Sequence, residues 1–393
     1  MNHRRGAGKS TAAKRQRVPP ILDKPIRWGR AIAAKSTKAR RFIVNNEVAL
    51  AIVMAIVVIC LGVFWGWYNN RIVPVNYIKI SHYWGEPHNP LSFMSGWDGP
   101  LYLQIAQHGY KNAVWSNFFP LYPAIIGIVN KVIPSVLDSG LIVAWTALVG
   151  AIYFYIKIVK RLFHVSDNLE ALRALLFFVF FPTGVFLIAT FTESLFAFLA
   201  LGAIYFALKK QLIPTALFAA FCTATHVNGI AVLLLLALIL WEEGIKRINI
   251  VLTILIGSTG LLFFMLALFI RFHNPFLFIT AQTLHGWLKG SYSNVFSADL
   301  FNLLFILGLL LAAIYWWPRR KSFSVYALTF IAIPIVGRQF GGFNRYVLMA
   351  FPLQLMLYGY LRDKKTAYAL AMVFFGAAWA YFTLQYAGGY VGG

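Results

Sequence analysis

The chain has 393 residues, of which 60% are hydrophobic and only 12% are charged. Soluble domains carry about 25% charged residues, so this composition excludes an ordinary soluble protein. The formal charge of +23 would indicate nucleic-acid binding in a soluble protein, but 13 of the 35 Lys and Arg residues lie in residues 1–41, before the first apolar run. That position is typical of a cationic flank that stays in the cytoplasm and is attracted to anionic membrane lipids. We therefore expect membrane lipids, and no nucleic acid, as partners.

Repeated apolar runs of about 20 residues predict transmembrane helices and an all-α polytopic membrane protein. The first run, from Val48 to Trp67, is too long for a signal peptide and lacks a small-residue cleavage site, so it is expected to remain as an anchor. Cys60 and Cys222 both lie in apolar runs and indicate neither a disulfide framework nor a metal site.

The domain organisation follows from these patterns. Residues 1–45 are predicted to be a basic, disordered cytoplasmic tail, and residues 46–393 a membrane domain. The first span, 48–68, runs from inside to outside, and 69–117 forms a long extracytoplasmic first loop. The next run, 118–136, holds three prolines, so we expect an interfacial or re-entrant segment. A clean span at 141–159 then returns to the cytoplasm.

The middle of the chain shows a polar corner and a broken helix. A span at 171–188 runs outward, 189–193 forms the corner, and 194–208 returns. The run 213–241 has cationic flanks at both ends and is interrupted by Thr225-His226-Val227-Asn228-Gly229. These features predict two short helices that meet in a break near the outer side, a geometry tolerated where it lines protein or a cavity.

The remaining runs alternate across the membrane. Predicted spans are 249–272, 300–317, 325–336, 346–361 and 367–384, with external loops at 273–298 and 337–345. Counting the broken run as two, about eleven membrane-embedded helices are expected. The sequence shows no internal repeat, which disfavours an inverted-repeat transporter.

Cations on the outer side are unusual, because positive-inside bias works against them. The expected topology places there Arg271, Lys289, Arg338 and Arg345, with His226 and His273 nearby. Such groups suit an anionic substrate headgroup such as a lipid phosphate. The alternative is that each arginine reaches the interface or pairs with an acid.

Asp98 is one of only 12 acidic residues and lies in the first polar loop, between Trp97 and Gly99-Pro100. A carboxylate beside an indole loses hydration, which favours a general base. The alternative is an aspartate that caps a turn. A metal set with Glu86 and His88 would need ligand spacing that the sequence does not show.

Glu193 separates two apolar segments. An ionisable group in a membrane segment predicts function, but a carboxylate in the first turn of a helix is also ordinary capping chemistry. Both readings stay open. The sequence shows no Walker loop, GxGxxG or HExxH motif.

Several stretches, in order, resemble the GPI mannosyltransferase 2 (PIG-V) family and its prokaryotic relatives. The first is Trp97-Asp98 with Tyr102, Gly109-Tyr110 and Phe118-Phe119-Pro120-Leu121-Tyr122-Pro123. The others are Thr192-Glu193-Ser194, Ala224-Thr225-His226-Val227-Asn228-Gly229, Asn274-Pro275-Phe276 with Gln282 and Trp287, and Arg345-Tyr346-Val347-Leu348. Two positions depart from the family pattern: Gly99 stands where serine is expected, and His226 where arginine is expected.

The resemblance implies a GT-C fold with an extracytoplasmic active site and an inverting transfer of mannose from a polyprenyl (dolichyl) phosphate mannose donor. It implies that Asp98 is the catalytic acid-base residue. The substrate-binding candidates are Trp97, Tyr102, His108, Glu193, His226, Asn228, Gln282, Trp287, Arg338 and Arg345. No cofactor is required, although a divalent metal ion remains an option.

The acceptor is open: a glycolipid, a glycan or a protein. The expected location is a bacterial or archaeal plasma membrane, or the endoplasmic reticulum membrane in a eukaryote, with the N-terminus cytoplasmic. The rival functions are a GT-C transferase for another lipid-linked sugar or a protein acceptor, a transporter of a lipid-linked substrate, and a non-catalytic scaffold.

Overall fold

The computed structural model describes residues 46–72, 88–284, 296–337 and 342–388. Every regular element within these ranges is a helix, and the described residues from Glu47 onward form one compact unit. The chain is thus an all-helical, multi-pass membrane protein, as its composition predicts. The predicted tail, 1–45, lies outside the described residues.

Among the residues that the structure describes, three helices are long and apolar enough to cross a membrane: α2 (Glu47–Ile72), α5 (Val136–Phe163) and α17 (Lys365–Ala387). A fourth span is available if the bent pair α10 (Arg247–Gly257) and α11 (Thr259–Phe272) counts as one.

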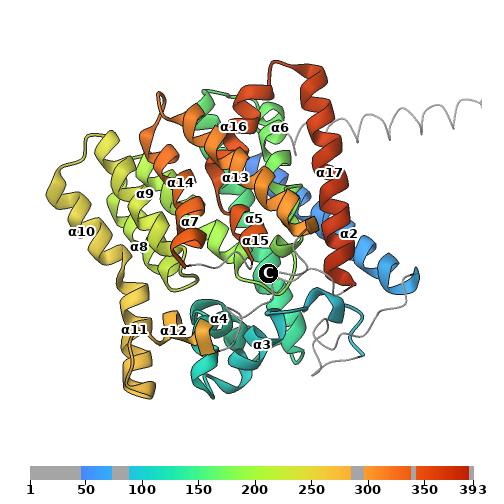
Figure 1. Cartoon of the computed structure of the whole chain (residues 1–393), viewed down its shortest axis with the longest axis vertical. Coiled ribbons are helices and arrows are strands. Elements are labelled where there is room, and N and C mark those ends of the chain that lie inside the picture. The colour runs from blue at the N-terminus through green and yellow to red at the C-terminus, as the bar shows by residue number, and fades with distance from the viewer. Residues whose placement is uncertain (1–45, 73–87, 285–295, 338–341, 389–393) are drawn as a thin grey trace, which may run out of the picture. The chain divides into compact units, whose positions relative to one another are not determined.

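Shorter apolar helices fill the space between the long ones (Figure 1). They are α7 (Glu193–Leu208), α8 (Leu212–Thr223), α9 (Gly229–Glu242), α13 (Phe296–Trp316) and α14 (Lys321–Gly337). The predicted number of about eleven embedded helices stays a prediction, since their lengths alone do not decide which of them cross.

The first polar loop folds into short helices beside one end of the bundle. Its described part contains η1 (Ser92–Met94), α3 (Gly99–His108), η2 (Ala113–Asn117) and α4 (Leu121–Val129). At 1.5 Å per residue α4 rises only about 13 Å, less than half of a hydrocarbon core of about 30 Å. The segment 118–136 therefore does not cross as one helix, in agreement with the prediction.

The break predicted between 213 and 241 is present, because α8 ends at Thr223 and α9 begins at Gly229. Gly260 allows α11 to approach α8 closely: a Cβ at this position would lie 1.9 Å from the Ala220 carbonyl oxygen. Small residues at such crossings are typical of helix packing in membranes.

Three predicted spans differ in the structure. The run 171–188 is not one helix: α6 (Asn168–Val179) stops before Pro182, and a short η3 (Gly184–Leu187) follows, because the residue before a proline disfavours helical backbone.

The run 249–272 bends by 40° between α10 and α11, next to Gly257-Ser258, a pair that commonly kinks helices. The run 346–361 is divided into α15 (Phe343–Val347) and α16 (Phe351–Leu361). In addition, the predicted loop 273–298 contains α12 (Leu277–Leu284).

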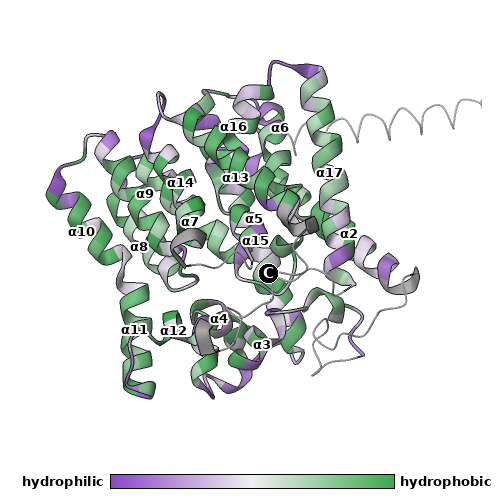
Figure 2. Cartoon of the chain, in the orientation of Figure 1, coloured by the Kyte–Doolittle hydropathy of each residue, from purple (hydrophilic) through white to green (hydrophobic). Residues whose placement is uncertain are grey.

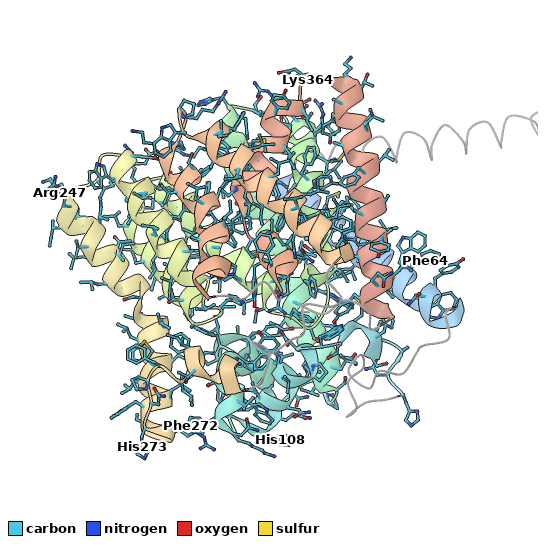
Figure 3. All side chains as sticks on the ribbon, in the orientation of Figure 1. Phe64, His108, Arg247, Phe272, His273 and Lys364 are labelled. Carbon is cyan, nitrogen blue, oxygen red and sulfur yellow. The ribbon has the colours of Figure 1, made fainter. Side chains whose placement is uncertain are left out.

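The bundle has two chemically distinct ends. Hydrophilic residues gather in the connections between apolar helices (Figure 2). Arg247 and Lys364 mark the end that we call the basic end, and His108 and His273 mark the opposite end, beside which α3 lies (Figure 3). We call the latter the site end.

Candidate active site

The Trp97-Asp98 corner joins η1 to α3 and is held under backbone strain. Trp97 has a φ of +53°, a left-handed conformation that costs a bulky residue about 1–3 kcal/mol and persists only where its surroundings impose it. The Gly96 N–H donates to the Tyr386 hydroxyl at 2.9 Å, and that hydroxyl lies 3.3 Å from the Met94 carbonyl. The Thr190 N–H donates to the same carbonyl at 3.0 Å. The corner is therefore fixed by α17 and by the stretch before α7.

Gly99 is required by the same close packing. A Cβ on this residue would lie 2.4 Å from the Thr190 Oγ1 and 2.9 Å from the Ser95 Oγ. The family resemblance predicts serine here, and the structure shows why this chain has glycine: its own Thr190 occupies the space.

The Asp98 side chain does not cap its helix. Asp98 is the N-cap residue of α3, yet its carboxylate makes no capping hydrogen bond. Its Oδ2 instead accepts a hydrogen bond of 2.7 Å from Nη1 of Arg345, a residue 247 positions away. The turn-capping alternative is therefore wrong for this side chain.

Glu193 completes an acid–arginine–acid group with Asp98 and Arg345. The Arg345 Nε lies 2.8 Å from the Glu193 Oε1. The side chains of Arg345 and Glu193 are only 5% and 3% exposed, whereas that of Asp98 is 19% exposed. Asp98 is therefore the member of the group that water and a substrate can reach. Glu193 is also the first residue of α7, so its charge favours the helix start as well.

Aromatic rings surround the Arg345 guanidinium. Its central carbon lies 5.0, 5.2 and 5.9 Å from the ring centres of Tyr346, Phe191 and Phe186. The Tyr346 hydroxyl also accepts from Nη2 at 3.3 Å. Such rings stabilise the cation and restrict its rotamers. Sequence reasoning missed Phe186 and Phe191, and it quoted Tyr346 only as a neighbour of Arg345.

Buried polar atoms without a hydrogen-bond partner cluster in the residues around this group. They include Ser95 Oγ, Trp97 Nε1, Thr192 Oγ1, Glu193 Oε2, Asn344 Oδ1 and Arg345 Nε, the last of which has an ion-pair contact but no hydrogen bond. Buried polar atoms are nearly always paired in folded proteins, so each exception requires an explanation. A polar ligand that binds beside Asp98, Glu193 and Arg345 would supply the missing partners.

His226 and Asn228 occupy the break between α8 and α9, outside both apolar helices. The Asn228 N–H donates to the His226 Nδ1 at 3.1 Å, so that nitrogen carries no proton. Burial and then the Arg345 charge lower the pKa of His226 to about 3. Its ring packs 5.3 Å from that of Tyr346. His226 is thus a neutral neighbour of the site and adds no positive charge to it.

Tyr102 is buried on α3 and packs edge-on against the rings of Phe118 and Tyr122. Burial raises the pKa of its hydroxyl, and the charges of Arg345, Asp98 and Glu193 also act on it. Tyr102 therefore borders the charged group and stays protonated.

His108 is not brought to this group. It is exposed at the far end of α3 (Figure 3), and ten residues of helix separate it from Asp98 by about 15 Å. Gln282 belongs to α12, but its side chain, like the whole of Trp287, Lys289 and Arg338, lies outside the described residues.

Within the four described ranges, no group of three or more His, Cys, Asp or Glu residues is placed to hold a metal ion.

Comparison with known proteins decides the family. The family described as Mannosyltransferase (PIG-V) matches residues 78–285, more than half of the chain. The chain belongs to the PIG-V family of mannosyltransferases. The PIG-V match includes Asp98, Glu193 and His226, while Arg345 lies beyond it.

Two curated relatives carry the name GPI mannosyltransferase 2. The one from Drosophila pseudoobscura pseudoobscura is 30% identical over 118 residues, which cover 28% of this chain and 26% of the relative. The one from Drosophila melanogaster is 26% identical over 113 residues, covering 27% and 25%. This PIG-V chain thus matches about a quarter of the length of these relatives. No solved structure matches it.

Proposed function

We propose that the protein is a membrane mannosyltransferase that transfers mannose, with inversion, from polyprenyl phosphate mannose to an acceptor hydroxyl. The PIG-V match supports the sugar and the reaction class. The observation that carries the proposal is the pairing of the partly exposed Asp98 with the buried Arg345. Charge develops at two centres when a sugar is transferred from a phosphate. A carboxylate can take the proton of the attacking oxygen, and a cation beside it can stabilise the negative charge of the leaving phosphate.

In this mechanism Asp98 is the general base. It takes the proton of the acceptor hydroxyl while that oxygen forms a bond to the anomeric carbon. The bond from that carbon to the phosphate oxygen breaks on the opposite face, and the lipid phosphate leaves with the electron pair. A phosphate is a good leaving group and needs no proton, so one carboxylate suffices where glycoside hydrolysis needs two.

Arg345 is proposed to change partners during binding. Without substrate its guanidinium holds Asp98 through Nη1. An incoming phosphate would compete with Asp98 for these N–H groups. Once the guanidinium binds the phosphate, Asp98 is free to accept a proton, and the guanidinium stabilises the negative charge of the departing phosphate. The unpartnered Glu193 Oε2 and Trp97 Nε1 are an acceptor and a donor suited to sugar hydroxyls.

A groove suited to the lipid chain lies near the break between α8 and α9. It has a volume of about 610 Å³ and is lined mainly by apolar side chains of α4, α8 and α11. Arg271 of α11 adds one positive charge to its wall. The Leu121 N–H at the start of α4 donates to the Ala224 carbonyl at the end of α8, directly before the break that holds His226. The groove therefore adjoins the segment next to Tyr346 and Arg345, where the phosphate is proposed to bind.

Orientation follows from charge. The basic end is proposed to be cytoplasmic under the positive-inside rule, which places the site end and Asp98 outside. Nucleotide sugars are cytoplasmic, so a lipid-linked donor fits this orientation. The acceptor is then an extracytoplasmic glycolipid, glycan or protein, to be identified by mass spectrometry of the glycans lost when the protein is deleted.

The test is transfer by the purified protein from polyprenyl phosphate mannose carrying a labelled sugar. We expect labelled product whose anomeric configuration, read by NMR, is opposite to that of the donor. Polyprenyl phosphate glucose should serve as a poor donor, which separates this function from a GT-C enzyme for another sugar. Movement of intact donor across vesicles without product would identify a transporter and overturn the proposal. So would retention of configuration.

A further inference from the structure

A polar cavity lies at the basic end of the bundle, away from Asp98. Its volume is about 690 Å³, and α2, α5 and α7 supply most of its wall. Its charged lining residues are Glu47, Glu243, Lys157, Lys160, Arg161, Lys209 and Arg320. About twenty residues of α5 separate Asp138, near the site end, from Lys157, which corresponds to about 30 Å of helix. This cavity is thus distinct from the candidate active site.

The cavity holds more positive than negative charge. Five Lys and Arg side chains face two carboxylates, which leaves a net charge of +3 with histidine neutral. Lys157 and Lys160 both pair with Glu47, and Arg320 pairs with Glu243 at 2.8 Å. The carboxylates therefore already have cationic partners, and the cavity has unneutralised positive charge.

Arg161 and Lys209 carry this excess charge. Arg161 uses Nη2 to donate to the Leu208 carbonyl at 2.6 Å, which fixes the guanidinium at the cavity and engages one of its five N–H groups. The Lys209 ammonium lies 5.5 Å from the ring centre of Tyr205, a second lining residue. Both side chains are exposed to solvent, but they line the same cavity, so their two charges converge on one space instead of on separate parts of the surface.

We propose that this cavity binds the phosphate headgroup of an anionic glycerophospholipid. It lies where α2 begins and α5 ends, at the boundary between the apolar helices and their polar ends. Lipid phosphates lie at this depth of a bilayer, and basic pockets between membrane helices on the cytoplasmic side bind anionic headgroups. An adjoining cavity of about 410 Å³ shares Leu162, His164 and Arg320 with it and adds Arg319, Arg362 and Asp363, which is one further positive charge in sum. The positive surface therefore continues beyond the first headgroup position.

The test measures lipid binding by the full chain in phosphatidylcholine nanodiscs with increasing phosphatidylglycerol, read by thermal unfolding and by native mass spectrometry. We expect phosphatidylglycerol to raise the unfolding temperature and to remain bound, with both effects weakened between 50 and 500 mM NaCl. The variant Arg161→Gln/Lys209→Gln should bind phosphatidylglycerol about tenfold or more weakly, because each cation near an anionic lipid contributes on the order of a fivefold change in affinity.

A matched control removes the same charge elsewhere at the basic end. Lys246 and Arg247 are exposed and line neither cavity, so Lys246→Gln/Arg247→Gln should bind phosphatidylglycerol as the parent does. Equal losses in both double variants would overturn the proposal, since binding would then depend on general charge. Equal stabilisation by inorganic phosphate would overturn the lipid as the source of the phosphate. If the first double variant does not fold, Lys209→Gln alone, compared with Lys246→Gln, decides the question by the same criteria.

Discussion

Removing the Arg345 side chain is expected to destabilise the protein more than removing either carboxylate. Arg345 contacts Asp98 at 2.7 Å and Glu193 at 2.8 Å, and both Arg345 and Glu193 are at least 95% shielded from solvent. The variant Arg345→Gln would leave a buried Glu193 carboxylate without its cation. Breaking a buried ion pair by removing one partner costs about 3–5 kcal/mol. In a chain of this size, about 2 °C per kcal/mol gives a fall in unfolding temperature of roughly 6–10 °C.

A double-mutant cycle makes this reasoning testable. In Glu193→Gln the arginine keeps Asp98 as its partner, so the expected loss is only about 1–3 kcal/mol. The double variant Arg345→Gln/Glu193→Gln should be more stable than Arg345→Gln alone, because no unpaired carboxylate remains deep in the protein. Fluorescence-detected thermal unfolding of purified protein in one detergent measures all three variants. Additive losses, or a double variant less stable than Arg345→Gln, would refute the coupling of these side chains.

Three further outcomes are expected. Gly99→Ser should lower the unfolding temperature, because a Cβ at this position would press on Thr190 at a cost of about 1–3 kcal/mol. Adding Thr190→Ala to this variant should recover part of the lost stability. An unchanged unfolding temperature in Gly99→Ser would contradict the close packing. Tyr386→Phe should leave the Gly96 N–H without its hydrogen-bond partner, which costs about 1–3 kcal/mol and should lower transfer activity. Full transfer activity would show that α17 does not position the Trp97-Asp98 corner. The pKa of His226 is about 3 in the folded protein, below its value of about 6.5 in the unfolded chain. The contribution of neutral His226 to stability is therefore fully present above pH 6.5 and is lost below it by up to about 1.4 kcal/mol per pH unit. The unfolding temperature should fall less between pH 7.5 and 5 in His226→Gln than in the parent, and parallel curves for the two proteins would refute this.

The sequence predicted candidate site residues best where polar residues interrupt an apolar run. Asp98, Glu193 and the His226–Asn228 break were found because polar groups are rare in such a chain, and the described helices break or start beside each of them. The bend at Gly257-Ser258 was missed, although a Gly-Ser pair in the middle of a long apolar run favours one.

The sequence could not show which distant side chains meet. The partners Asp98 and Arg345 are 247 positions apart, and only the folded chain brings Arg345 of α15 to the starts of α3 and α7. Proximity along the chain was misleading for His108, because a helix carries its end residue away from its start. The contribution of Tyr386 had no sequence signal, since its role is to hold a strained backbone that becomes visible only in three dimensions.

The central claim is that Asp98 is the base of a mannose transfer. Its most direct test is the steady-state rate of transfer from polyprenyl phosphate mannose by Asp98→Asn, beside the matched variant Asp138→Asn. Asp138 is another carboxylate in this part of the bundle, and it accepts a hydrogen bond from Asn89 at 3.0 Å. We predict that Asp98→Asn lowers kcat by about 10²–10⁴-fold while it still folds, with an unfolding temperature lowered by only about 2–6 °C, and that Asp138→Asn retains activity. Transfer by Asp98→Asn at the parental rate would contradict the claim.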